Sequence, residues 1–209
     1  MSESNITKKY LAATLKELLR STPFEKVSVS DICDTCGISR KTFYYHFQDK
    51  FALAEWVFNT EFIAGLKKAP PSDFWEIVRA VCEYFYEERQ FYSALLQYGG
   101  QNSFREHFQS FLFDTLAQYL LPDMEKIQSI AEDGNLPTDE TRTFFVHYVS
   151  DSLLIVIYRW ISTGAHMPPQ EFVALLQSVS KLIQIRENEK TGPNAGADGA
   201  VEKADVPAT

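Results

Sequence analysis

The sequence predicts an all-α fold in which a three-helix head containing a helix-turn-helix precedes a larger helical body. Apolar residues recur at the roughly 3.6-residue spacing of amphipathic helices through most of the chain, and no segment alternates convincingly as a half-buried strand does. The 209 residues are 45% hydrophobic and include 16 Phe and 10 Tyr, so the chain can bury a core rich in aromatic contacts.

The first two expected helices are delimited by capping and breaking residues. Apolar residues at helical spacing, beginning with Ile6, predict a first helix that ends near Arg20, before a Ser-Thr-Pro sequence. Ser28 or Ser30 caps a second, short helix that ends at Gly37. Glycine is expected there because it adopts the left-handed backbone of a tight turn at little cost.

A third helix completes the expected helix-turn-helix. Ser39 caps this helix, which runs to about Phe47, while Ile32 and Ile38 are spaced to pack it on the second helix. Phe43 and Phe47, four residues apart, point into the core. The outward face then carries cations, hydroxyls and an imidazole, which can bind phosphates and base edges in a major groove. These residues are Arg40, Lys41, Thr42, Tyr44, Tyr45 and His46.

The helices of the body begin at capping residues or at proline, and they end at Gly or Pro. They are expected over residues 49–66, 72–89, 90–98, 103–121, 138–163 and 168–189. Pro122 is expected to interrupt the helix that precedes it. Beyond residue 189 the sequence is rich in Gly, Ala, Asp and Pro, so we expect a disordered tail over residues 190–209.

The charge of the chain is unevenly distributed. The formal net charge is −8, but residues 1–50 carry +2 and residues 51–209 carry −10. Phosphate binding depends on local charge, so a basic head on an acidic body remains compatible with a nucleic-acid partner.

The stretch from residue 27 to residue 50 resembles the TetR family of transcription regulators. The residues that carry the resemblance are Ile32, Cys33, Gly37, Ile38, Ser39, Phe43, Tyr44, His46, Phe47 and Lys50. The resemblance implies an all-helical fold, with a helix-turn-helix DNA-binding domain over 1–50 and a helical regulatory and dimerisation domain over 51–189.

The same resemblance implies which side chains face DNA. They are Ser28, Arg40, Lys41, Thr42, Tyr44, Tyr45, His46 and Lys50. Tyr44, His46 and Lys50 would mainly hold phosphates, and the others on the third helix would lie nearer the bases.

The later part of the chain more weakly resembles a subgroup that includes activators of dihydroxyacetone kinase operons. The matching stretches are Phe91-Tyr92, Asn102-Ser103-Phe104, Tyr158 to Ile161, Gly164 and Pro168-Pro169.

Cys33 and Cys36 stand where this family usually has alanine-like residues. Their Cys-x-x-Cys spacing is also found in metal and redox sites, but no second ligand pair lies nearby in the sequence. We therefore expect small buried side chains there, with no metal and no cofactor.

The body is expected to dimerise and to bind an effector. Leu153 to Ile161 is apolar almost all round its helix, so a second copy of the chain is expected to cover one face of this helix. The last helix would complete a four-helix interface across the two-fold axis. Aspartate at Ile157 or Leu176 would then break the dimer or unfold the chain. Most of the aromatic residues of the body are expected to be core, and a subset could line a pocket with His107, His147 or Asp151 as polar groups. The aromatic residues are Trp75, Phe85, Tyr92, Phe104, Phe108, Phe111, Phe113 and Tyr148.

These observations predict a cytoplasmic homodimer that binds double-stranded, pseudo-palindromic operator DNA. An unknown small molecule or partner protein would modulate it, without a membrane and without enzymatic activity. The three cysteines fit a reducing compartment, and no long apolar run indicates a membrane span. Two alternatives remain: a helical enzyme whose site is not visible in sequence, and a protein-interaction module.

Overall fold

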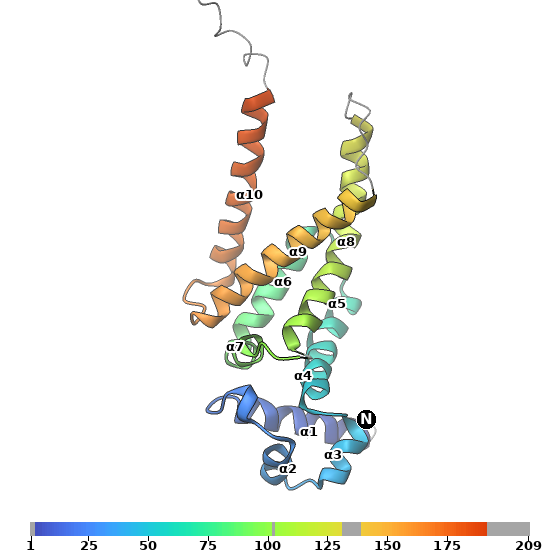
Figure 1. The fold of residues 1–209 in the computed structure, drawn as a ribbon, viewed down its shortest axis with the longest axis vertical. Helices are drawn as coiled ribbons and strands as arrows, with labels where there is room; N and C mark the ends of the chain where they lie inside the picture. Colours follow the sequence, from blue (N-terminus) through green and yellow to red (C-terminus); the bar gives the residue numbers. More distant parts are fainter. Residues whose placement is uncertain (1–2, 102, 131–138, 192–209) are drawn as a thin grey trace, which may run out of the picture.

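The computed structural model describes residues 3–101, 103–130 and 139–191, and the regular elements in this part of the chain are all helices (Figure 1). The predicted all-α fold is therefore confirmed. The predicted tail lies outside the described residues from 192 onward, whereas residues 190 and 191 belong to the last helix.

The helices follow the order expected from the sequence. They are α1 (Glu3–Leu18), α2 (Val29–Cys36), α3 (Arg40–His46), α4 (Lys50–Phe58), α5 (Ala64–Lys68), α6 (Phe74–Glu87), α7 (Arg89–Gln97), α8 (Phe104–Ile130), α9 (Asp139–Ser162) and α10 (Pro169–Thr191). A 3-10 turn, η1 (Phe24–Lys26), lies between α1 and α2, and a π-helical turn, η2 (Asn59–Ile63), joins α4 to α5.

Four helices begin at the side-chain caps that the sequence indicates. Ser28, Ser39, Asp49 and Asp73 each accept a hydrogen bond from the backbone N–H three residues later. Such caps satisfy backbone donors that have no partner inside the helix, so they define where each helix starts.

Three expectations about the helices were wrong in detail. The helix expected to end at Leu121 continues through Pro122 to Ile130, because proline removes one backbone hydrogen bond without preventing the others. The helix expected over 49–66 contains the π-helical turn η2. Ile6, which the periodicity assigned to the apolar face of the first helix, is 56% exposed.

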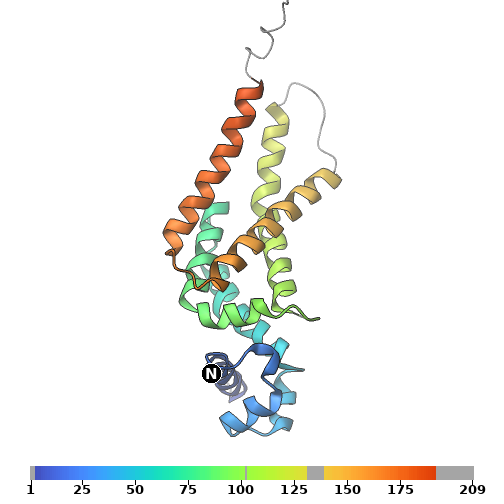
Figure 2. The ribbon, with the colours of Figure 1, turned by 60° about the vertical axis from the view of Figure 1, so that its left-hand side comes forward.

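The head and the body meet through α4. Helices α1, α2 and α3 pack together at one end of the molecule, and α4 packs on α1 near its start and on α8 farther along (Figure 1). Figure 2 shows α7 lying across the top of the head, between the head and the long helices of the body. Two elements, α4 and α7, therefore stand at the head–body boundary.

The core of the body is an aromatic cluster centred on Phe58 of α4. Its fully buried ring has a centroid within 6.5 Å of those of Phe62, Tyr84, Phe85, Tyr92, Phe104, His107, Phe108 and Phe111. Most of the aromatic residues of the body named from the sequence thus lie in the core, as expected for most of them. Tyr148 lies outside this core and is 61% exposed, and His147 stacks on Phe113 with the centroids 4.2 Å apart.

Helix α9 is long and apolar enough, by length and composition alone, to cross a membrane. This is weak evidence, because core helices of soluble proteins have the same composition. In the structure α9 packs along α8 and α7, with Leu153, Leu154 and Ile157 buried.

Candidate nucleic-acid interface

The turn between α2 and α3 has the geometry that a helix-turn-helix requires. Gly37 has φ 65° and ψ 25°, the left-handed conformation that favours glycine, and its N–H donates to the carbonyl oxygen of Cys33. Ile38 N also donates to this oxygen, at 3.1 Å. The chain then enters α3 through Ser39, whose hydroxyl accepts from Thr42 N at 3.1 Å.

Side chains on the inner face hold the two helices in this arrangement. Ile32 and Phe43 are fully buried, Phe47 is 6% exposed, and Val29 and Ile38 pack against the same core. The rings of Phe43 and Phe47 lie 6.0 Å apart. The predicted core positions of the helix-turn-helix are therefore confirmed.

The outer face of α3 carries the predicted polar side chains. Arg40 and Lys41 are exposed, and neither side chain has a hydrogen bond or an ion pair with another described residue. Tyr44 is 57% exposed and Tyr45 is 81% exposed. Two fixed cations and two phenol hydroxyls thus face solvent from a single short helix.

Two further residues of α3 are partly engaged inside the protein. Thr42 Oγ1 lies 2.8 Å from Ser39 Oγ, so this hydroxyl takes part in the cap as well as facing outward. The half-buried His46 ring packs edge-on against Tyr45 at 5.0 Å. Both side chains are held in place at the edge of the outer face.

Ser28 is exposed at the start of α2, and its hydroxyl belongs to a capping box. Ser28 Oγ accepts from Asp31 N at 3.2 Å and donates to Asp31 Oδ2 at 2.7 Å, and Ser28 N donates to the same carboxylate oxygen at 2.8 Å. This geometry fixes the first turn of α2.

The side chain of Lys50 is placed differently from the expectation that it holds a DNA phosphate. Its ammonium donates to the carbonyl oxygens of Phe24, Glu25 and Val27, at 2.6, 3.2 and 2.7 Å. It also lies 4.6 Å from the centroid of the Phe24 ring. An ammonium has three donors, and all three are used here. Lys50 therefore braces η1 and the start of α2. The spacing of the motif residues does not predict this role, because it depends on carbonyl oxygens that only the folded head brings next to Lys50.

Sequence reasoning missed Lys8 and Lys26 as candidate phosphate ligands. Lys8 Nζ of α1 lies 5.5 Å from the centroid of the Phe47 ring, beside the end of α3. Lys26 is exposed at the end of η1, two residues before Ser28. The Lys-Lys pair at residues 8 and 9 was the available signal for Lys8, but its position beside α3 depends on tertiary packing.

Cys33 and Cys36 are buried on the inner side of α2, and both are free thiols. Cys36 Sγ donates to the Cys33 carbonyl oxygen at 3.7 Å, and burial raises the pKa of the Cys33 thiol. Among the described residues, no group of three or more His, Cys, Asp and Glu lies together as metal ligands would.

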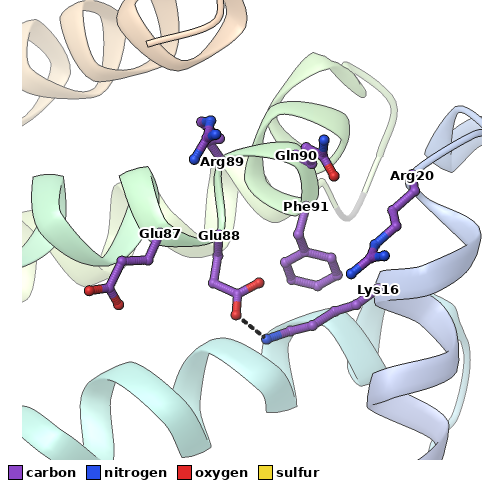
Figure 3. A pocket seen from close by; sticks show the side chains of 7 residues that line it. All are labelled: Lys16, Arg20, Glu87, Glu88, Arg89, Gln90 and Phe91. Carbon is purple, nitrogen blue, oxygen red and sulfur yellow. Dashed lines mark ion pairs between the residues drawn. The ribbon is translucent and has the colours of Figure 1, made fainter. Parts of the chain in front are cut away.

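A charged cluster joins the head to the body on the far side from α3. Lys16 Nζ of α1 lies 2.7 Å from Glu61 Oε2 and 3.0 Å from Glu88 Oε1. Tyr84 donates to Glu61 at 3.1 Å, and Tyr92 donates to the Tyr84 hydroxyl at 2.9 Å. Figure 3 shows Lys16 of α1 paired with Glu88, with Arg20, just after α1, on the same side of a cavity of about 350 Å³.

The capping box predicts an acid-sensitive head. The hydrogen bonds from Ser28 lower the pKa of Asp31, so this carboxylate contributes stability above the unfolded-state pKa of about 3.9, and that contribution is lost as the pH falls through the folded-state pKa. We expect Asp31→Asn to show a smaller loss of melting temperature between about pH 6 and pH 3 than the unaltered protein, measured by circular dichroism. Asp34→Asn, at an exposed site on the same helix, is the control. Equal pH dependence in the two variants would contradict the assignment.

Comparisons with known proteins agree with this geometry. Residues 11–57 match the family described as bacterial regulatory proteins, tetR family, and residues 73–182 match the family described as a transcriptional regulator C-terminal region. The chain is also 29% identical over 126 residues to the HTH-type dhaKLM operon transcriptional activator DhaS of Lactococcus lactis subsp. lactis (strain IL1403). That match covers 60% of this chain and 66% of the relative, just under two thirds of its length.

Solved structures share the fold. A structure of the dihydroxyacetone kinase operon activator DhaS has a TM-score of 0.58 and 23% identity, with 87% of this chain and 96% of that chain covered. A structure described as a putative TetR-family transcriptional regulator from Syntrophomonas wolfei str. Goettingen has a TM-score of 0.66 and 15% identity, with 88% of this chain and 97% of that chain covered. The two family matches together span the helix-turn-helix and most of the body, so this chain belongs to the TetR family and is a DNA-binding transcription regulator.

Proposed function

We propose that the protein binds a pseudo-palindromic operator as a homodimer, with α3 of each protomer in a major groove. The observation that carries this proposal is the exposed outer face of α3, where Arg40 and Lys41 have no hydrogen bond or ion pair with another described residue and Tyr45 is 81% exposed. Helices of this type read base edges through residues near their start, while neighbouring residues hold phosphates.

The proposed contacts follow from where each side chain lies. Arg40, Lys41, Thr42 and Tyr45 are nearest the bases, and the phosphate ligands are Ser28, Tyr44 and His46, with Lys8 and Lys26 added from the structure. Lys50 is left out because its ammonium is already bound by three carbonyl oxygens. We keep the division into a DNA-binding domain over 1–50 and a regulatory and dimerisation domain from residue 51.

The proposed dimer interface is the exposed apolar surface of α9 and α10. Ile155 is 47% exposed, Leu175 is 50% exposed and Val179 is 47% exposed. Apolar side chains this exposed on two consecutive helices favour a partner surface, and a second copy of the chain satisfies the two-fold symmetry of paired half-sites. The apolar character of α9 then serves both the core and the interface.

An effector, either a small molecule or a partner protein, is proposed to change operator affinity through the body. The relative in Lactococcus lactis is described as an operon activator, which supports regulation of an operon by this chain as well. We also propose that the protein is cytoplasmic and has no enzymatic activity, in keeping with relatives that are transcription regulators.

Binding to genomic DNA fragments tests this function directly. We expect at least one fragment to be retained over random DNA at low salt, with the logarithm of affinity falling linearly with the logarithm of salt concentration. Arg40→Ala and Lys41→Ala should each weaken binding by about 5- to 150-fold and relax the base preference, because each removes a contact of about 1–3 kcal/mol. Lys67→Ala, at an exposed site on α5, should leave binding unchanged. If no fragment is retained over random DNA, the proposal fails.

A further inference from the structure

The body also contacts the head at a place other than α4 and the charged cluster around Lys16. The ring centroid of Tyr98, directly after α7, lies 5.6 Å from that of Phe24 in the head and 5.4 Å from that of Phe51 at the start of α4. Lys50 Nζ lies over both of these rings, at 4.6 and 5.5 Å. We call Phe24, Lys50, Phe51 and Tyr98 the head–body joint.

The turn after α7 is shaped around the ring of Tyr98. A Cβ atom on Gly100 would lie 2.2 Å from Tyr98 Oη and 2.4 Å from Tyr98 Cζ, so any larger residue at position 100 would displace the Tyr98 ring. A Cβ on the neighbouring Gly99 would meet nothing within 4 Å. The requirement for glycine at position 100 therefore comes from Tyr98 and not from the turn itself.

The joint acts on the segment that leads into the DNA-binding helices. Phe24 is 2% exposed and begins η1, whose last residue lies two positions before Ser28, the cap of α2. Lys50 holds the carbonyl oxygens of this same segment. Because Lys50 ties η1 to the start of α2, a shift of Tyr98 against Phe24 would move the head as a unit.

A cavity of about 540 Å³ beside the joint leaves room for such a shift. It is lined by the Ser21–Glu25 segment of the head and by Gln97, Tyr98, Gly99 and Gly100 of the body. Head and body therefore do not pack tightly there, and the contacts of Tyr98 with Phe24 and Phe51 set the distance between them locally.

We propose that Tyr98 is a positioning residue for operator binding. It is the residue directly after α7, which crosses the body side of the head (Figure 2), and it is not part of α2 or α3. It sets the orientation of the head relative to the body, and thereby the separation of the two recognition helices in a dimer. Two half-sites about 34–36 Å apart can be bound together only when the two recognition helices have a matching separation. This inference rests on the proposed function.

The test uses the full-length chain and a duplex selected from a random library by the unaltered protein. Tyr98→Ala and Gly100→Ala should each weaken binding to the full duplex by about tenfold, within the usual range of coupling between sites, while binding to a duplex with one half-site replaced stays unchanged. Tyr98→Phe and Gly99→Ala are the matched controls, and both should bind as the unaltered protein does. The double variant should be no weaker than Tyr98→Ala alone, because both changes act on one ring.

Three outcomes would overturn the proposal. The first is full-duplex binding by Tyr98→Ala and Gly100→Ala equal to that of the unaltered protein, and the second is an equal loss on the half-site duplex, which would show damage to the head itself. The third is additive losses in the double variant. Thermal melting monitors folding, and Tyr98→Leu replaces Tyr98→Ala if the latter does not fold. Failure of the unaltered protein to select any duplex would instead refute the proposed function.

Discussion

Replacing Ile155 with aspartate is expected to lower affinity for a full operator by about 10²- to 10⁴-fold. Ile155 is 47% exposed in the single chain, so the charge costs the monomer little, whereas in the proposed dimer it would be buried without a partner. Loss of the dimer removes the second half-site, and linked binding of two sites exceeds single-site binding by about this factor. Sedimentation and operator binding measure the two effects on one preparation.

The choice of residue decides what this experiment means. Ile157, which the sequence analysis selected, is 1% exposed within the monomer, so aspartate there would unfold the chain and report nothing about the dimer. Gln118→Asp, at an exposed site on α8, is the control for added charge. A folded Ile155→Asp protein that still sediments as a dimer would show that the interface lies elsewhere.

Replacing Lys50 with methionine is expected to destabilise the head by about 2–3 kcal/mol. The change keeps the aliphatic stem but removes three hydrogen bonds from a charged donor, two of them to the partly buried carbonyl oxygens of Phe24 and Val27. For a chain of this size, such a loss lowers the melting temperature by about 4–12 °C. Thermal melting followed by circular dichroism is the measurement.

A second measurement separates the brace from a phosphate contact. If Lys50 braces η1, Lys50→Met should lose stability without DNA, while the salt dependence of its operator binding keeps the slope of the unaltered protein. Lys26→Met, at the exposed neighbouring lysine, should show the reverse: an unchanged melting temperature and a shallower slope. An unchanged melting temperature for Lys50→Met with a reduced slope would restore Lys50 as a phosphate ligand.

The parts of the fold that sequence predicted are those decided by local chemistry. Gly37 and Ser39 define the turn and cap of the helix-turn-helix through their own backbone preferences, and Phe43 follows from helical spacing. Pro122 shows the limit of such rules, because the remaining backbone hydrogen bonds carry α8 past it. The π-helical turn is a further case, since no local residue preference marks where an extra residue enters a helix.

The candidate site divides in the same way. The outward face of α3 follows from the spacing of Arg40, Lys41 and Tyr45 on one short helix. The actual partners of Lys50 do not, because Phe24 and Val27 are distant in sequence and only the folded head brings their carbonyl oxygens together. Tyr98 was missed for the same reason.

The π-helical turn at Asn59–Ile63 affects how rotation is transmitted along the continuous helical segment of α4, η2 and α5, which leads from the head into the body. One extra residue in a helical turn advances everything beyond it by about 100° around the axis. Two polar side chains of this turn are held: Asn59 Oδ1 lies 3.0 Å from His107 Nε2, and Glu61 is bound by Lys16. The rotation of α5 about the helix axis relative to α4 is therefore fixed by the contacts of Asn59 with α8 and of Glu61 with α1. A twist between α4 and α5 would have to break these contacts.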